Sequence, residues 1–439
     1  MKIAFVGGGS VLWTPTLTVD IALTDTLADA NLVLHDIDAD ALELLTQTSK
    51  RIVAQVGGSL QITATLDRSE ALRDADFVIL CVGIGGLAAM RYDLQIPERY
   101  GVYQSVGDTV GPGGLARGLR HIPFAVRVAR EMETLCPTAW LLNLTNPMTT
   151  ICRAVTRTTT IRTLGLCHEA TGMRRHLASM FDTAVETVAL DVTGINHLPV
   201  IPSFRVGGHD GTAMLRDWLA GNGPFAFMDQ HDPDPHRDVF RDRLAVKLAL
   251  FKQLGVLFGA GDRHVAEFFP GFLSEASERG RRYGVGLTTI EQREELARQR
   301  RARVERFVGG EPRELRQSEE QLAPVIVALT VGPTGQFIVN VPNRGQIDNL
   351  PRGAVVECVA DVDALGVRPL AAGALPHAAY AVIAPHVARQ ELIVEAALTG
   401  CRGPALIALA TDPLVPDPAT AEPMLDELLA ANAAFITDH

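Results

Sequence analysis

Short apolar runs recur along the first part of the chain, and most of them end at glycine or polar residues. Six such runs lie at residues 3–6, 31–35, 61–66, 77–82, 139–144 and 163–166. Runs of this length that are rich in Val, Ile and Leu predict buried strands. Helical patterns stand between several of them, for example at residues 16–27 and 69–72. Strands that alternate with helices in this way predict an α/β fold built on a doubly wound, Rossmann-like parallel sheet.

The pattern changes in the second part of the chain. Apolar runs alternate with longer helical patterns at residues 188–195, 200–206, 244–254 and 290–308. This mixture predicts an α+β domain that packs on the first one. Apolar elements near the C-terminus either close that domain or contact another subunit, and they lie at residues 391–398, 405–410 and 424–430. We therefore divide the chain into two domains, at residues 1–168 and residues 169–439.

The first apolar run ends in a glycine turn that precedes a helical pattern. A strand, a glycine-rich turn and a helix hold the pyrophosphate of a dinucleotide on backbone N–H groups at the helix N-terminus. Gly7 and Gly9 match the first two glycines of this fingerprint, whereas Leu12 stands where the third is expected. A second glycine turn follows the fourth run at the same edge of the sheet. The predicted cofactor contacts of the two turns are Gly7, Gly8, Gly9, Ser10 and Gly83.

The second apolar run ends at Asp36. An acidic residue at this position binds the ribose hydroxyls of NAD, and no neighbouring arginine offers a partner for the 2′-phosphate of NADP. The sequence therefore favours NAD as the cofactor. The alternative interpretation is that Asp36 only forms a turn at the strand end.

Composition and charge limit the classes of protein to which the chain can belong. The chain has 439 residues, of which 47% are hydrophobic and 21% are charged, so it can bury a large core. The net charge of -11 argues against a nucleic-acid partner. No apolar stretch reaches the length of a membrane span, the cysteines are far apart, and the first residues predict a strand rather than a signal peptide. We expect a cytoplasmic protein.

Two short segments carry candidate chemistry. Cys167 and His168 follow the sixth run, where open α/β sheets place their functional groups. A small buried cysteine beside an incidental histidine is the alternative. The other segment, residues 107–114, is rich in glycine around Asp108. With Arg117 close behind, this segment is more typical of a clamp for a substrate or cofactor than of a surface turn.

These segments, together with others further along, resemble glycoside hydrolase family 4, a family of NAD- and divalent-metal-dependent glycosidases. The matching motifs occur in the family's order and are Gly7-Gly8-Gly9-Ser10, Asp36-Ile37-Asp38, residues 107–114, Asn146-Pro147-Met148, Gly165-Leu166-Cys167-His168, Gly194-Ile195-Asn196-His197, His264-Val265-Ala266-Glu267, residues 343–351 and Asp412-Pro413-Leu414-Val415. Each motif is weak by itself, and the ordered set is specific. The resemblance implies an NAD-binding domain at residues 1–168 and a domain for substrate, metal and oligomer contacts at residues 169–439.

The resemblance also implies hydrolysis by redox-assisted elimination, an exception to the usual mechanism with two carboxylates. NAD oxidises the sugar at C3, which acidifies the proton on C2. A base removes that proton, and a general acid protonates the leaving group at C1. Water then adds and the hydride returns, so that NAD is recycled. A divalent cation stabilises the enediolate between C2 and C3.

The metal ligands of the family match Cys167 and His197. A thiolate and an imidazole leave most coordination positions open for sugar oxygens and water. The family implies Mn²⁺, although these two ligands alone would favour a softer ion such as Zn²⁺. Asn146 matches an asparagine that contacts the sugar hydroxyls near the metal, and we expect it to line the cofactor site as well. Asn196 is expected to contact the same hydroxyls.

Proton transfer needs an acid and a base. His168 stands where some members carry the general acid, and an imidazole can fill this role near neutral pH. The alternative is that His168 only supports the metal ligand. The tyrosine base of the phospho-glucosidase members has no counterpart here, so Asp262 is the first candidate for the base and His264 the second. Glu267 is the third, unless it only forms an ion pair with Arg263.

The segments around Asp108 and Asp262 are most similar to the branch of the family that acts on uronic acids. Guanidinium groups form bidentate pairs with carboxylates, which makes Arg91, Arg117 and Arg263 candidates for binding a uronic acid. We therefore expect an enzyme similar to the α-galacturonidases, with α-glucuronidase second and α-galactosidase, α-glucosidase or 6-phospho-glycosidase after it. The predicted substrate contacts are Arg91, Asp108, Asn146, Asn196 and Arg263.

Two other classes of function remain open from the sequence. An NAD-dependent 2-hydroxyacid dehydrogenase would share the N-terminal fold but would leave Cys167 and His197 unexplained. A non-catalytic NAD sensor would need neither a metal nor Asn146. The family itself implies a homodimer or homotetramer that binds a small sugar.

Overall fold

The six N-terminal apolar runs all form strands of one parallel sheet. The structure is a computed structural model that describes residues 1–228, 235 and 238–437. The strands are β1 (Lys2–Val6), β2 (Asn31–His35), β3 (Gln61–Thr65), β4 (Phe77–Leu80), β5 (Trp140–Asn143) and β6 (Arg162–Gly165). They lie in the order β3-β2-β1-β4-β5-β6, and every neighbouring pair is parallel. This is the doubly wound order of dinucleotide-binding folds, and it confirms the predicted fold class.

Helices cover both faces of this parallel sheet. Along β1, Ile3 and Phe5 contact one apolar core, whereas Ala4 and Val6 contact the other. The first core is completed by α1 (Trp13–Ala22), α2 (Ala39–Val56) and α12 (Leu322–Thr330), and the second by α5 (Gly111–Leu135) and α6 (Met148–Thr158). Because neither face of the central strands meets water, these strands are continuous apolar runs and not alternating ones.

Strands from the second half of the chain extend the same sheet. After β6 the order continues β13-β14-β8-β9-β12 with antiparallel neighbours. The strands are β13 (Gly335–Pro342), β14 (Val355–Asp363), β8 (Thr193–Ile195), β9 (Leu198–Ile201) and β12 (Leu257–Phe258), and β15 (Gly366–Pro369) pairs with β14. Asn340 of β13 pairs with Gly165 of β6. One sheet thus runs through both parts, and the division at residues 168 and 169 stays a prediction.

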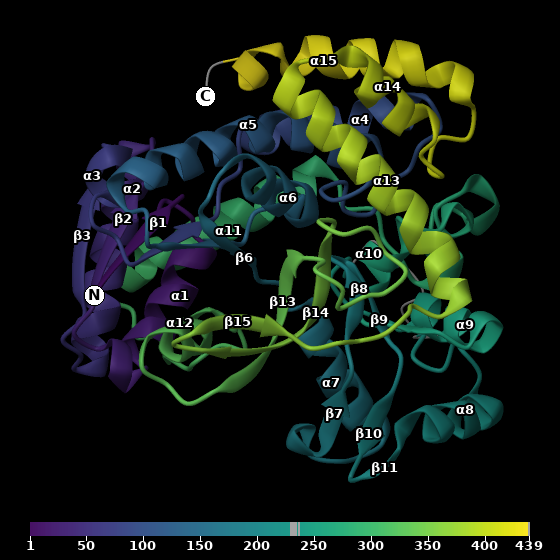
Figure 1. Ribbon diagram of the computed structural model, residues 1–439, viewed down its shortest axis with the longest axis horizontal. Coiled ribbons are helices and arrows are strands. Elements are labelled where there is room, and N and C mark those ends of the chain that lie inside the picture. The colour runs from purple at the N-terminus through teal and green to yellow at the C-terminus, as the bar shows by residue number, and fades with distance from the viewer. Residues whose placement is uncertain (229–234, 236–237, 438–439) are drawn as a thin grey trace.

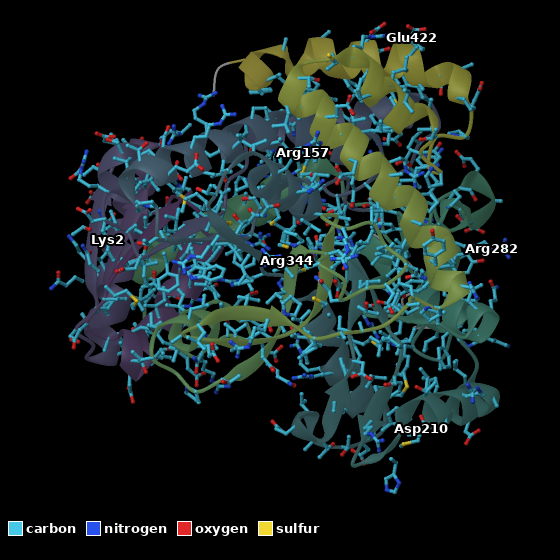
Figure 2. All side chains as sticks on the ribbon, in the orientation of Figure 1. Lys2, Arg157, Asp210, Arg282, Arg344 and Glu422 are labelled. Atoms are coloured by element: carbon cyan, nitrogen blue, oxygen red, sulfur yellow. The ribbon has the colours of Figure 1, made fainter. Side chains whose placement is uncertain are left out.

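A smaller sheet and further helices complete the second half. In Figure 1, α13 (His377–Thr399) crosses the upper right of the molecule, and α14 (Arg402–Ala410) and α15 (Ala421–Thr437) lie beside α5, with which both pack. The small sheet, of β7 (Val188–Leu190), β10 (Phe204–Val206) and β11 (His209–Asp210), lies at the opposite end together with α8. Figure 2 labels Glu422 on α15 and Asp210 before α8, which mark these two ends.

The remaining helices connect these layers. Their bounds are α3 (Arg68–Leu72), α4 (Gly86–Arg99), α7 (Glu169–Met180), α8 (Gly211–Asn222), α9 (Ala245–Leu254), α10 (Asp262–Ala266), α11 (Ile290–Val308), α13 (His377–Thr399), α14 (Arg402–Ala410) and α15 (Ala421–Thr437). Short 3₁₀ segments are η1 (Asp25–Leu27), η2 (Val185–Thr187), η3 (Pro270–Phe272), η4 (Glu275–Ser277), η5 (Arg281–Tyr283) and η6 (Pro418–Thr420). Within the described ranges, no helix is both long and apolar enough to cross a membrane.

The glycine-rich segment at residues 107–114 differs from the predicted loop. From Gly111 onward it forms the first turn of α5, so only its first half is a loop. A Cβ on Gly114 would lie 2.4 Å from the carbonyl carbon of Thr109. The glycine therefore allows a close backbone approach, as its composition indicated, but here the approach is between the loop and its own helix.

Gly7→Ala is expected to destabilise the protein strongly. The added Cβ would lie 1.9 Å from the carbonyl oxygen of Cys81, and the φ of +99° is unfavourable for a residue with a Cβ. We expect a loss of about 3 kcal/mol or more in the free energy of unfolding, measured by chemical denaturation. Gly57→Ala is the matched control, because Gly57 also has a positive φ but no atom lies within 4 Å of its added Cβ. The control should lose only about 1 kcal/mol, and equal losses would contradict the steric argument.

Candidate active site

A cavity of about 1010 Å³ opens at the carboxyl ends of the parallel strands. Its wall extends from the glycine turn after β1 to helix α10 and includes Gly7, Asp36, Gly83, Cys167 and His264. Open α/β sheets bind their ligands at this edge. A second cavity, of about 450 Å³, is lined by none of the predicted site residues. The larger cavity is therefore the candidate active site.

The glycine turn and Asp36 form one end of this cavity. The Gly9 N–H donates to Asp36 Oδ2 at 2.8 Å, and the Ile37 N–H donates to Asp36 Oδ1 at 2.8 Å. These bonds hold the carboxylate of Asp36 beside the turn. Of the predicted cofactor contacts, the cavity wall includes Gly7, Gly9, Ser10, Asp36, Gly83 and Asn146. Gly8 is not part of the wall, because its Cα faces Leu34 of β2.

Asp108, His197 and His264 form a cluster of potential metal ligands further along the cavity. Each offers one ligand atom, and these atoms lie within 4.8 Å of one another. The rings of His197 and His264 have their centroids 3.7 Å apart. His197 Nδ1 is 2.8 Å from the hydroxyl of Thr109, which orients the imidazole. The loop after α4, the turn between β8 and β9, and the helix α10 thus bring three chemical groups together.

The protonation states of this cluster suit a cation. Burial, and then the neighbouring His264, lower the pKa of His197 to about 3, so that its ring is neutral at neutral pH. Burial alone would raise the pKa of Asp108, but the neighbouring His197, His264 and Arg117 outweigh it and hold the pKa below its usual range. Neutral imidazoles and carboxylates are the forms that bind metals. The cluster therefore has the protonation states that the binding of a divalent ion requires.

Cys167 lines the same cavity but is not a member of the close cluster. Burial, and then the charge of Glu357, raise the pKa of the Cys167 thiol well above its ordinary value. The thiol stays protonated until a cation displaces the proton. Cys167 and His197, the two ligands that the sequence indicated, therefore share one cavity, and Asp108 and His264 join them there.

A buried row of residues with two polar members, Asn340 and Glu357, crosses the sheet next to Cys167. Gly165, Asn340, Glu357 and Gly194 are neighbours on adjacent strands. The amides of Asn340 and Asn196 both donate to Glu357 Oε2, at 3.0 and 3.1 Å. Burial raises the pKa of Glu357 to about 7. Because its side chain is turned toward Glu357, Asn196 does not line the cavity, in contrast to its predicted contact with a sugar.

His168 lies at the N-terminus of α7 and lines the cavity. Its Nδ1 is 3.1 Å from Glu320 Oε1, and its Nε2 is 3.6 Å from Glu169 Oε1. The hydrogen bond with Glu320 raises the pKa of His168 above its ordinary value, which stabilises the protonated form of the ring. The imidazole is half exposed and can meet a ligand.

Two of the three predicted bases do not reach the cavity. Asp262 accepts the N–H groups of Val246 and Lys247 and so binds the first turn of α9. Glu267 accepts the N–H groups of Val106 and Gly107. Both carboxylates accept backbone N–H groups, and neither residue lines the cavity. The sequence spacing indicated acidic residues near the site, but it could not show that they hold the loops around it.

The predicted arginines also separate in the structure. Arg91 forms ion pairs of 2.9 Å with Glu291 and Glu294 and does not line the cavity, which removes the basis for its predicted contact with the substrate. Arg117 and Arg263 do line it. Arg117 is turned toward the strand ends, where its Nε donates to the carbonyl oxygen of Asn146.

The cavity wall and its immediate support include residues that sequence reasoning did not single out. These are Thr109, Glu169, Arg293 and Glu320. Glu169 directly follows Cys167-His168, and Thr109 follows Asp108, so adjacency to a motif was an available signal. Arg293 and Glu320 lie in charged segments of the second half and carry no local signal, because only the folded chain brings them to the cavity.

Comparison of the chain with known proteins shows which protein family it matches. The model of the "Family 4 glycosyl hydrolase" family matches residues 2–183. The model of the "Family 4 glycosyl hydrolase C-terminal domain" matches residues 192–415. The two models together cover most of the chain and all residues of the metal-ligand cluster.

Individual relatives match along nearly the full length. An alpha-galacturonidase of Thermoanaerobacterium saccharolyticum is 34% identical over 429 residues, which are 94% of this chain and 92% of the relative. A Bacillus subtilis crystal structure described as a glucosidase has a TM-score of 0.91 at 32% identity and covers 98% of this chain and 99% of its own. The 6-phospho-beta glucosidase of Thermotoga maritima, solved with manganese, NAD+ and glucose-6-phosphate, has a TM-score of 0.82 at 25% identity, with 99% of each chain covered.

Glu267→Gln is expected to flatten the pH dependence of stability. Burial raises the pKa of Glu267 from 4.5 to about 7, so the folded state binds a proton that the unfolded state releases between these values. The free energy of unfolding of the wild type therefore falls as the pH rises from 4.5 to 7, by about 3 kcal/mol from this group. Gln keeps an oxygen for the two N–H groups and has no proton to lose.

Chemical denaturation at pH 5 and pH 8 measures this difference. The variant should lose about 3 kcal/mol less between the two pH values than the wild type. Glu314→Gln, at a solvent-exposed position, is the control and should behave like the wild type. An unchanged pH dependence in Glu267→Gln would show that its carboxyl group does not titrate in this range.

Proposed function

The chain belongs to the family 4 glycosyl hydrolases, and we propose that it hydrolyses α-glycosides of galacturonic acid with NAD and a divalent metal ion, for which Mn²⁺ is the first candidate. The observation that carries the choice of sugar is the cationic part of the cavity wall, which includes Arg117, Arg263 and Arg293. A uronic acid brings the carboxylate that guanidinium groups bind best. The similarity to an alpha-galacturonidase supports the same choice.

The residues at the strand ends fit NAD. Gly7, Gly9 and Ser10 line the space before α1 in which its pyrophosphate would lie. Asp36, at the end of β2, would bind the ribose hydroxyls. The space over the turn is shaped by glycine, because a Cβ on Gly9 would lie 2.8 Å from Asp36 Oδ2 and press on that carboxylate.

A divalent cation fits the other end of the cavity. Cys167 and His197 would bind it, and Asp108, from the same cluster as His197, would offer a third ligand. The buried Oδ1 of Asn146 has no hydrogen-bond partner among the described residues, so it is free for a hydroxyl of the sugar. Together, bound NAD and a cation supply a reversible hydride acceptor for the sugar and a Lewis acid for its oxygens.

The histidines of the cavity fit the two proton transfers. Burial lowers the pKa of His264, and no described residue forms a hydrogen bond with its buried Nδ1, so a neutral ring can accept the proton from C2 of the sugar. His168, bound to Glu320, can donate a proton to the leaving oxygen. We therefore propose His264 as the base in place of Asp262, because Asp262 binds the turn of α9.

Other sugars of the same family are the alternatives. An α-glucuronidase would use the same cationic wall, and a 6-phospho-glycosidase would also need cations. An α-galactosidase or α-glucosidase would leave the guanidinium groups without a partner. A 2-hydroxyacid dehydrogenase is not proposed, because the family models account for both halves of the chain.

We further propose that the protein is cytoplasmic and forms a homodimer or homotetramer. The free state of all six cysteines supports a reducing compartment. Exposed apolar side chains on the C-terminal helices, such as Tyr380 and Ile407, support a contact with another copy. Neither a nucleic acid nor a membrane is needed for the proposed reaction.

Hydrolysis of 4-nitrophenyl α-D-galacturonide should require both NAD and Mn²⁺. Release of nitrophenol is followed with each additive left out in turn, and absorbance at the same time reports NADH. We expect release only with both additives and no accumulation of NADH, because the hydride returns to the sugar in each cycle. Accumulating NADH would instead indicate a dehydrogenase. Release only from a glucuronide, a neutral glycoside or a 6-phosphate would keep the family mechanism and contradict the choice of sugar.

His264→Asn should lower kcat about 10²- to 10⁴-fold without a comparable loss of stability, because it removes the proposed base. Asp262→Asn should instead lower the free energy of unfolding by about 1–2 kcal/mol, because it weakens the bonds to the first turn of α9. Exchange of the C2 proton of the sugar with deuterated solvent reports the base step directly. Loss of this exchange in Asp262→Asn, with exchange retained in His264→Asn, would reverse the two roles.

A further inference from the structure

Two guanidinium groups meet in the wall of the cavity. Arg263 belongs to α10 and Arg293 to α11, and both side chains line the cavity. Arg263 Nη2 donates to the carbonyl oxygen of Ser105 at 3.1 Å, and Arg293 Nη2 donates to that of Val106 at 3.1 Å. The two groups thus hold successive carbonyls of the loop that carries Asp108, and they lie close to one another.

Neither guanidinium has an ion-pair partner in the part of the chain that the structure describes. No carboxylate oxygen lies within 4.0 Å of either group there, and the Nε atoms of both are buried without a hydrogen-bond partner. Arg120 shows the usual arrangement, because Asp93 binds it through two hydrogen bonds of 2.6 and 2.8 Å. The pair in the cavity departs from this arrangement.

The charge of this pair is costly unless an anion binds. Burial, and then the charge of Arg263, lower the pKa of Arg293 to about 10, so the group is still cationic at neutral pH. The charges of Asp108 and Glu267 attract both groups from a distance, but the stronger attraction of a direct ion pair, which would offset the lost hydration, is missing among the described residues. An anionic group that enters the cavity restores that attraction, and a planar carboxylate can accept paired N–H groups from each guanidinium.

We infer that Arg293, together with Arg263, binds the carboxylate of the uronic acid and selects anionic sugars over neutral ones. This inference rests on the proposed function and extends it to a residue outside the family motifs. The phosphate of a 6-phospho-sugar and the pyrophosphate of NAD share part of this chemistry. The contacts of Arg293 favour the sugar, because Val106 belongs to the loop that presents Asp108 and Thr109 to the metal-ligand cluster.

The test compares Arg293→Met, Arg293→Lys and Arg298→Met with the wild type, all as full chains loaded with NAD and Mn²⁺. Arg298 is the matched control, because it lies on the same helix but pairs with Glu295 at the surface. The activity measurement is kcat/KM for 4-nitrophenyl α-D-galacturonide and for the α-D-galactoside, which differ only at C6. Titration calorimetry adds the Kd values of D-galacturonate and NAD.

Arg293→Met should lower kcat/KM for the galacturonide and weaken D-galacturonate binding about 100-fold, since it removes one partner of a buried charge pair. Activity on the galactoside and the Kd of NAD should stay within about twofold. Arg293→Lys keeps the charge but not the paired N–H groups, and it should lose about tenfold. Arg298→Met should match the wild type.

Several outcomes would overturn the assignment while the proposed function stands. One is an equal loss of kcat/KM on both substrates in folded Arg293→Met. A second is a loss of NAD binding in the same folded variant. If that variant does not fold, an unchanged preference for the galacturonide in folded Arg293→Lys overturns the assignment as well. Failure of the proposed function appears earlier, as wild-type protein that hydrolyses no galacturonide, and it overturns the assignment together with the choice of sugar.

Discussion

The pairing of β13 with β6 is the constraint on which the candidate active site depends. Through the contact of Asn340 with Gly165, the antiparallel strands of the second half continue the parallel sheet of the first. Glu357 occupies the next position of this row and accepts hydrogen bonds from Asn340 and Asn196. The row therefore connects the strand before Cys167 to the segment that carries His197. Without this strand pairing, the glycine turn and the metal ligands would not lie at the same edge of one sheet.

Burial of charge shapes the rest of the cavity. Carboxylates that hold loops, such as Glu267, accept backbone N–H groups and do not line the cavity. Histidines beside Asp108 are kept neutral by burial, which suits both metal binding and proton transfer. Arg263 and Arg293 keep their charge without an ion-pair partner among the described residues, which favours an anionic ligand at this part of the wall. The partner that each charged group has, or lacks, therefore indicates its role in the cavity.

Residues directly after buried strands were predictable from the sequence. The glycine turn, Asp36 and Cys167 follow apolar runs, and the carboxyl ends of parallel strands share one edge, so the order of runs and turns along the chain was enough to infer their common location. Functional roles predicted from residue type alone agreed less well with the structure. Asp262 and Arg91 have the right chemistry, but each is occupied by another partner, the first turn of α9 and a pair of glutamates. Local sequence does not show which partner a polar side chain will find.

The sequence by itself determined the doubly wound sheet, its strand ends and the family, because these depend on hydrophobic periodicity and on the order of short motifs along the chain. Only the tertiary structure decided that His264 reaches the cavity while its neighbour Asp262 does not. It likewise brought Arg293 to the cavity and Glu320 to His168, from segments with no motif of their own. The physical reason is that burial and pairing depend on contacts between residues far apart in sequence, and those contacts exist only once the sheet has formed.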